Sequence, residues 1–171
     1  MALRPRSGVE PWQATPVVGD SLALAIPKIN LALAQSSLNR LVAILWTSGA
    51  NDAIFEKSTG LSTATYQTAF EALATYLRAN IVGTGASTAP ILIQPLVPAF
   101  VTNPPTACPN TNAALSTMPS VVSQCGYADP TAPGMSGNII GQTAVAYHLT
   151  GPSQRLIGSI GFVNAYNGRS A

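Results

Sequence analysis

Apolar residues recur at helical spacing in the middle of the first half of the chain. They fall three or four positions apart, at Tyr66, Ala69, Phe70, Leu73, Tyr76, Leu77 and Ile81. This period predicts an amphipathic helix over residues 63–81. Thr63 or Ser62 would cap its first turn, and Gly83 would stop it.

The preceding stretch, from Ile26 or Pro27 to Trp46, is apolar on more than one face. We expect an amphipathic or buried first helix there, since a helix that is apolar nearly all round is buried or is covered by partners. Pro27 suits its first turn. Residues 1–19 contain three prolines and show no helical period, which predicts an extended arm. Trp12 is the apolar anchor of this arm, packed either on its own domain or on a neighbouring subunit.

Prolines dominate residues 84–137, where nine occur. Regular helices do not tolerate this density, so we expect a long irregular segment. Short apolar runs such as Ile91–Ile93 would form either extended segments or strands that the prolines confine to a sheet edge. One helical turn is expected between residues 112 and 124.

The last part of the chain has the pattern of strands. Residues 142–149 alternate small or apolar residues with polar ones, and apolar residues resume over 155–166 after Gly151-Pro152-Ser153. This predicts a C-terminal β-hairpin or small antiparallel sheet. The predicted fold is α+β: an arm, then one structural domain over 20–171 with a two-helix core, the proline-rich segment and the hairpin.

Charge is sparse and unevenly placed. The 171 residues include eight basic and six acidic side chains, or 8%, against about 25% in ordinary domains. This excludes a charged disordered tail, a coiled coil with charged flanks and a basic nucleic-acid module. Asp129 is the one charge between Ala79 and Gln154. That segment has either a polar uncharged surface facing solvent or a surface that meets other subunits.

Two cysteines, Cys108 and Cys125, lie 17 positions apart. A disulfide between them would contribute about 3 kcal/mol in the chain-entropy model and would fit an extracellular or virion-exposed protein. Two buried free thiols are the alternative. The N-terminal residues lack a signal-peptide pattern, and no apolar run is long enough to predict a membrane span.

Residues that carry out chemistry are few. The chain has one histidine, no G-x-S-x-G motif and no paired metal ligands, so we expect neither an enzyme nor a cofactor or metal site. Arg4, Arg6, Lys28 and Arg40 could form a small basic patch for nucleic acid or a protein partner. Scattered solubility charges are the alternative interpretation of these four residues.

These features favour a self-assembling structural subunit of a virus or phage particle, as a coat, decoration or tail component. Its partners would be copies of itself, with other virion proteins and nucleic acid as further candidates and no membrane. Uncharged polar surfaces suit such contacts, because charged residues are depleted at interface cores. An extracellular filament or surface-layer subunit is the first alternative, and a small secreted enzyme or binding module is the second.

Overall fold

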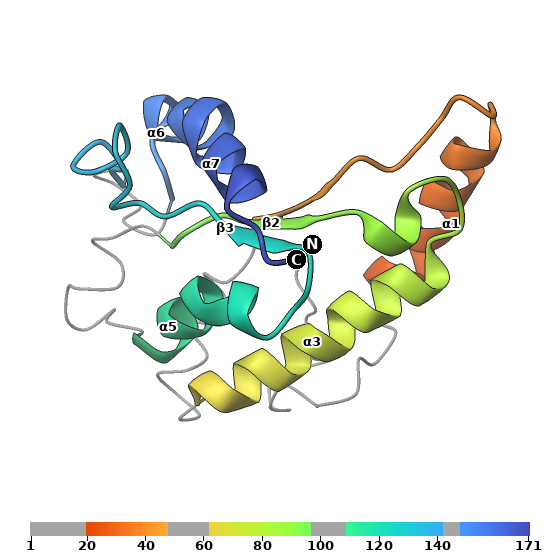
Figure 1. The fold of residues 1–171 in the computed structure, drawn as a ribbon, viewed down its shortest axis with the longest axis horizontal. Helices are drawn as coiled ribbons and strands as arrows, with labels where there is room; N and C mark the ends of the chain where they lie inside the picture. Colours follow the sequence, from red (N-terminus) through yellow and green to blue (C-terminus); the bar gives the residue numbers. More distant parts are fainter. Residues whose placement is uncertain (1–19, 48–61, 97–108, 142–147) are drawn as a thin grey trace.

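The computed structural model describes residues 20–47, 62–96, 109–141 and 148–171. Within these ranges helices and short strands form an α+β fold (Figure 1). The predicted arm, residues 1–19, lies outside the described part of the chain. The main elements are α1 (Asp20–Ala34), β1 (Ile44–Trp46), α3 (Thr63–Asn80), β2 (Ile91–Ile93), α5 (Pro109–Thr117), β3 (Cys125–Tyr127), α6 (Gly151–Leu156) and α7 (Phe162–Asn167).

The three strands form one parallel sheet in the order β1-β2-β3. Helices α3 and α5 pack on one face, and α7 packs on the other (Figure 1). In register across the sheet, Ile91 lies between Ile44 and Cys125, and Leu92 lies between Leu45 and Gly126. Because side chains alternate between the faces of a strand, these two rows point in opposite directions.

Contacts identify the two faces. Trp46 shares a face with Ile44, and its ring meets that of Phe70 of α3 edge to face, with centroids 5.3 Å apart. On the opposite face, a Cβ placed on Gly126 would lie 1.9 Å from the carbonyl oxygen of Ala165 in α7. Gly126 therefore lets α7 lie directly on the sheet, and we call this side the α7 face.

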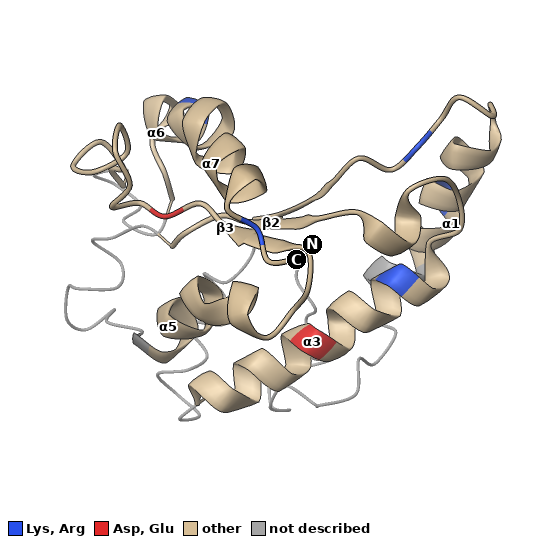
Figure 2. Ribbon diagram, viewed as in Figure 1, with Lys and Arg blue, Asp and Glu red and all other residues tan. Residues whose placement is uncertain are grey.

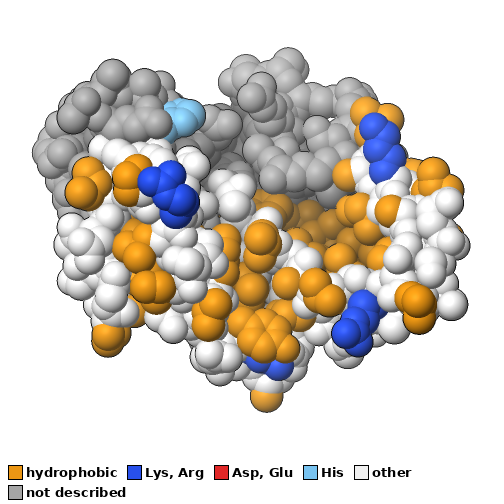
Figure 3. Space-filling model, turned by 90° about the horizontal axis from the view of Figure 1, so that it is seen from above, with side chains coloured by type: hydrophobic (Ala, Val, Ile, Leu, Met, Phe, Trp, Pro, Cys, Tyr) orange, Lys and Arg blue, Asp and Glu red, His pale blue; other side chains and the backbone are white. Residues whose placement is uncertain are grey.

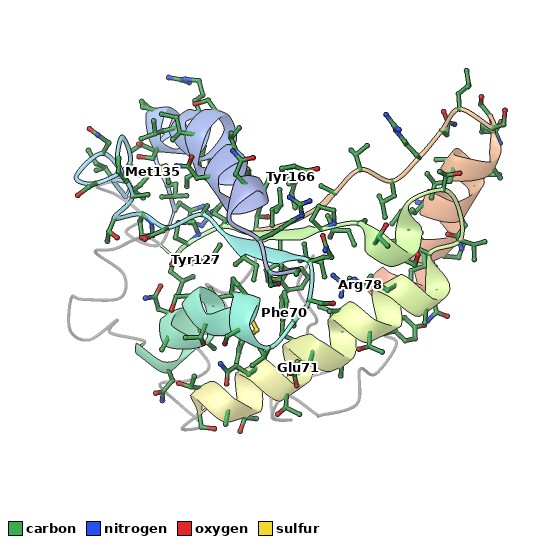
Figure 4. All side chains as sticks on the ribbon, in the orientation of Figure 1. Phe70, Glu71, Arg78, Tyr127, Met135 and Tyr166 are labelled. Atoms are coloured by element: carbon green, nitrogen blue, oxygen red, sulfur yellow. The ribbon has the colours of Figure 1, made fainter. Side chains whose placement is uncertain are left out.

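The predicted helix over 63–81 is confirmed as α3. The side chain of Ser62 caps it, accepting a hydrogen bond from the backbone N–H of Thr65 at 3.1 Å. Its inward stripe is buried and consists of Tyr66, Ala69, Phe70, Leu73, Ala74 and Leu77. Figure 4 shows Phe70 among the side chains between α3 and the sheet.

The predicted first helix is wrong at both ends. Helix α1 begins at Asp20, contains Pro27 in its interior and ends at Ala34, and the chain then runs on to β1. Polar side chains end the helix: Asn39 Nδ2 donates to the carbonyl of Ala32 at 2.8 Å, and Ser36 Oγ accepts from the N–H of Leu38 at 3.2 Å. These local bonds offer the backbone an alternative to helix.

The expected edge position of Ile91–Ile93 is also wrong, because β2 is the central strand. The prolines lie just outside the strand, so each of its residues keeps an N–H for pairing. Pro90 itself takes part through its carbonyl, which accepts from the N–H of Ile44 at 2.8 Å. The helical turn expected between residues 112 and 124 corresponds to α5. This helix starts at Pro109, and proline suits the first turn of a helix.

The predicted C-terminal antiparallel hairpin is contradicted, because the sheet is entirely parallel and residues 151–167 are helical. The Gly-Pro-Ser signal starts a helix rather than a turn: Thr150 Oγ accepts from the N–H of Ser153, and Pro152 occupies the first turn. A π-helical turn, Ile157–Gly161, joins α6 to α7. Within the described residues, the antiparallel pairing of this region is one isolated bridge, Gly141 to Leu149.

Candidate assembly surface

The described residues contain no cluster of three or more His, Cys, Asp or Glu side chains able to hold a metal ion. Their helices also include none with the length and apolar character needed to cross a membrane. Charged side chains are scattered singly over the described ribbon (Figure 2). The features that stand out are therefore exposed apolar side chains and the edges of the sheet.

Exposed apolar side chains are concentrated in the stretch that runs from α1 through β1. Of the ten exposed large hydrophobic residues among those described, half fall in this stretch. We call these five residues the apolar flank: Leu24, Leu31, Leu38, Val42 and Leu45, which are 62%, 63%, 87%, 66% and 55% exposed. Leu24 and Leu31 are seven positions apart in α1, so they share one helix face. Singly scattered apolar residues are ordinary on a surface, so it is the grouping of five of them within residues 24–45 that makes this stretch a candidate for contact.

The surface on the α7 side adds to this picture. Figure 3 shows hydrophobic side chains gathered in a hollow of this surface, with Lys and Arg around it and no described Asp or Glu in view. Val163 and Tyr166 of α7 are 52% and 44% exposed. The Tyr166 ring is partly covered by Arg169, whose guanidinium carbon lies 4.1 Å from the ring centroid.

The outer edge of β1 is the second element of the candidate surface. Ile44 and Trp46 direct their backbone groups toward β2. The N–H of Ile44 donates to the carbonyl of Pro90 at 2.8 Å, and the carbonyl of Trp46 accepts from the N–H of Gln94 at 2.8 Å. Alternate residues of a strand bond to opposite edges, so the N–H and C=O of Leu45 point outward. We call this row of backbone groups the β1 edge.

The opposite edge of the sheet is closed by the C-terminal residues. The N–H of Ser170 donates to the carbonyl of Cys125 at 3.0 Å, and the N–H of Cys125 donates to Ser170 Oγ at 3.1 Å. Ser170 Oγ also donates to the carbonyl of Val122 at 2.8 Å. Within the described residues, the two edges of the sheet therefore differ, since only the β3 edge has backbone partners beyond the sheet.

The residues predicted from sequence fall partly on this surface. Lys28 is exposed on α1, and Arg40 is exposed on the segment that leads into β1. Arg4, Arg6, Trp12 and Cys108 lie outside the described residues, so a basic patch of four residues and an anchoring role for Trp12 stay predictions. Sequence reasoning did not single out Val42 and Leu45, because it placed both in a continuous helix that was expected to be buried or covered by partners, whereas α1 ends at Ala34.

Cys125 is fully buried on the face of the sheet that α3 and α5 cover. Burial raises the pKa of its thiol to about 12, and the positive charge of Arg78 opposes this only in part. The thiol therefore stays protonated, and poorly nucleophilic, at neutral pH. Cys125 is a free thiol in the structure. Cys108, its partner in the predicted disulfide, lies outside the described residues, so the pairing stays a prediction.

The raised pKa predicts a loss of stability in alkali. In the unfolded chain the thiol ionises near pH ~8.5, whereas the folded protein keeps this proton until about pH 12. The free energy of unfolding should therefore fall as pH rises above about 9, since the folded state then binds more protons. Burial and the charge of Asp129 raise the pKa of Tyr127 as well, which adds a loss of the same sign above pH ~10.

Urea unfolding from pH 7 to 10.5, with a reducing agent present, would measure this dependence. Cys125→Ala should show a shallower decline with pH than the unaltered chain. Equal slopes for the Cys125→Ala variant and the unaltered chain would contradict the assignment of the alkaline loss to this thiol.

Comparison with known proteins adds no relative. No protein-family model matches the chain, and neither a curated protein nor a solved structure shows significant similarity. The functional interpretation therefore depends on the surface just described.

Proposed function

We propose that the protein is a self-assembling structural subunit whose copies associate through the apolar flank and the β1 edge. The observation that carries this proposal is the concentration of exposed Leu and Val side chains in the stretch from α1 through β1. Each of these side chains would leave water on association, and buried apolar area contributes roughly 25 cal/mol per Å².

The distribution of charge supports the same proposal. The described surface on the α7 side shows no Asp or Glu (Figure 3), and the chain has a net charge of only +2. Burying an unpaired charge costs far more than burying a hydrogen-bonded polar group. A surface with few charges can therefore meet another copy without a large desolvation penalty.

A virus or phage particle is the setting we propose for the assembly, with the chain as a coat, decoration or tail component. In such a particle each subunit contacts neighbours over much of its surface, which accords with 8% charged residues across the chain. Exposed Lys28 and Arg40 would then face either another virion protein or the packaged nucleic acid. The proposed location follows: the virion, or an extracellular assembly.

Charge placed on the outer face of α1 tests the proposal. We expect Leu24→Lys/Leu31→Lys to weaken self-association by about tenfold or more, because both ammonium groups would lose water at the interface. Light scattering coupled to size-exclusion chromatography would give the masses, and electron microscopy would show any particle or filament. Thr68→Lys/Thr75→Lys is the matched control, since both residues are exposed on α3 at the same seven-residue spacing.

The outcomes are distinct. Assembly of the unaltered chain and of the α3 control, together with dissociation of the α1 variant, would support the proposal. A stable 17.6 kDa monomer at high micromolar concentration would overturn it.

A further inference from the structure

We propose that α1 is a switch helix, which undocks and unfolds as one unit while the sheet stays folded, and that Asn30 holds it docked. This inference concerns the single chain and goes beyond the proposed self-assembly. It gives the molecule two states, docked and open, and a partner that binds one of them more tightly shifts the balance between them.

Helix α1 is lightly attached to the rest of the molecule. Among its described side chains, those of residues 24–34, only Ile26 is buried. Helix α3, by comparison, buries six side chains along its inward stripe. Figure 1 shows α1 at one end of the molecule, beside the C-terminal end of α3. Because apolar burial is the main stabilising contribution in folding, α1 is held much more weakly than α3.

The helix is also weak in itself. It has 15 residues and contains Pro27 in its interior. Pro27 has no N–H to donate to the carbonyl four residues before it, and its ring crowds that carbonyl. Isolated helices of about 12–15 residues are marginal in water even without a proline. An undocked α1 therefore loses its helical hydrogen bonds, so docking and helix formation occur together.

The side chain of Asn30 provides the polar attachment. Its Nδ2 donates to the carbonyl of Asn80 at 3.0 Å, and its Oδ1 accepts from the N–H of Val82 at 2.8 Å. The carbonyl of Asn80 belongs to the last turn of α3, where a helix leaves its carbonyls without helical partners. One side chain thus satisfies two backbone groups of another element, and we call these two hydrogen bonds the Asn30 latch.

The unit that opens has a defined C-terminal boundary. Residues 35–40 are all exposed. Beyond them, the N–H of Leu41 donates to the carbonyl of Thr84 at 2.9 Å. A Cβ placed on Gly85 would lie 2.5 Å from the carbonyl oxygen of Leu41, so the chain packs closely at this point. The chain is therefore fixed from Leu41 onward, and α1 can open about residues 35–40 while β1 stays in the sheet.

Hydrogen exchange of the full chain tests the inference. The chain would be diluted until light scattering gives the mass of a monomer, and exchange would be followed by mass spectrometry of peptic fragments. After correction for intrinsic rates, we expect fragments of α1 to exchange at least about tenfold faster than fragments of α3, and as one cooperative unit. They should still exchange more slowly than an unfolded chain.

A variant of the latch gives the second measurement. Asn30→Ala removes both hydrogen bonds and should speed exchange in α1 by about tenfold, with α3 and the sheet unchanged. Alanine is the better helix former, so an effect on helix propensity alone would slow exchange instead. Ile26→Ala, which removes the buried side chain of α1, should speed the same fragments. Asn164→Ala, at an exposed position of α7, is the control and should leave exchange in α1 unchanged.

Each outcome bears on the inference. Faster exchange confined to α1 in the Asn30→Ala variant supports it. A common exchange rate for α1 and α3 would show that α1 opens only when the whole fold does, and would overturn it. Exchange of α1 at the rate of an unfolded chain would also overturn it, as would equal acceleration of both helices, or of neither, by Asn30→Ala. A chain that stays monomeric at high micromolar concentration would overturn the proposed function and leave this inference intact.

Discussion

Gly126→Ala should destabilise the protein by about 3 kcal/mol or more, at the upper end of the cost of overpacking a core. The added Cβ would lie 1.9 Å from the carbonyl oxygen of Ala165 and 2.6 Å from its carbonyl carbon. Both are backbone atoms, so no change of rotamer relieves the overlap. Relief would require α7 to move off the α7 face, where it packs on β2 and β3.

Urea unfolding followed by circular dichroism would measure this loss, with the change in midpoint converted through an unchanged slope. Gly158→Ala is the control, because a Cβ there meets no atom within 4 Å. Its stability should be unchanged or higher by up to ~1 kcal/mol, since alanine is the better helix former. A Gly126→Ala variant within about 0.5 kcal/mol of the unaltered chain would contradict the tight packing of α7.

The sequence-based prediction was accurate where apolar and polar residues fall on opposite faces of one element. Helix α3 was predicted almost to the residue because it has one buried stripe and a polar remainder. The stretch from α1 to β1 is apolar on several sides, so its pattern does not show where helix gives way to strand. The boundary depends on two side-chain hydrogen bonds, one that Ser36 Oγ accepts from a backbone N–H and one that Asn39 Nδ2 donates to a backbone carbonyl. Hydrophobic periodicity does not detect such bonds.

The C-terminal error has a different cause. Residues 155–166 mix apolar and small residues in a way that suits a strand, and their glycines weaken the case for a helix. In the structure, Gly161 packs closely on residues far from it in sequence, since a Cβ there would come within 2.9 Å of Met135 Cε and 3.2 Å of Ala128 Cβ. Such contacts do not appear in the local sequence pattern. Thr150 and Pro152 are the local signals of a helix start that could have corrected the prediction.

The expectation of subunit contacts stays a prediction, and the apolar flank lies outside the segment where the sequence placed those contacts. Low charge led from sequence to an expectation of subunit contacts, centred on residues 79–154. The structure instead concentrates exposed hydrophobic residues earlier, between Leu24 and Leu45. Burial depends on which neighbours cover a side chain, and Leu45 is exposed because α7 covers β3 and β2 rather than β1.

The second large effect is expected from Phe70→Ala, which should cost about 3–5 kcal/mol. Phe70 is 1% exposed, and its ring contacts the ring of Trp46, the last residue of β1. The substitution would therefore remove both a large buried side chain and the aromatic pair that fixes β1 to α3. In the described sheet, β1 has a neighbouring strand on one side only. The contact between Trp46 and Phe70 therefore helps to hold β1 in position.

The consequence for assembly distinguishes this variant from a general loss of stability. In a Trp12→Phe background, fluorescence reports on Trp46 alone, since the chain has two tryptophans. Phe70→Ala should shift Trp46 emission to longer wavelength and weaken self-association under conditions where circular dichroism still shows folded protein. Leu73→Ala removes an equally buried residue of α3 and should cost about 2–5 kcal/mol. If the Leu73→Ala and Phe70→Ala variants weaken association equally at matched folded fractions, the Trp46–Phe70 contact has no specific role in holding the β1 edge.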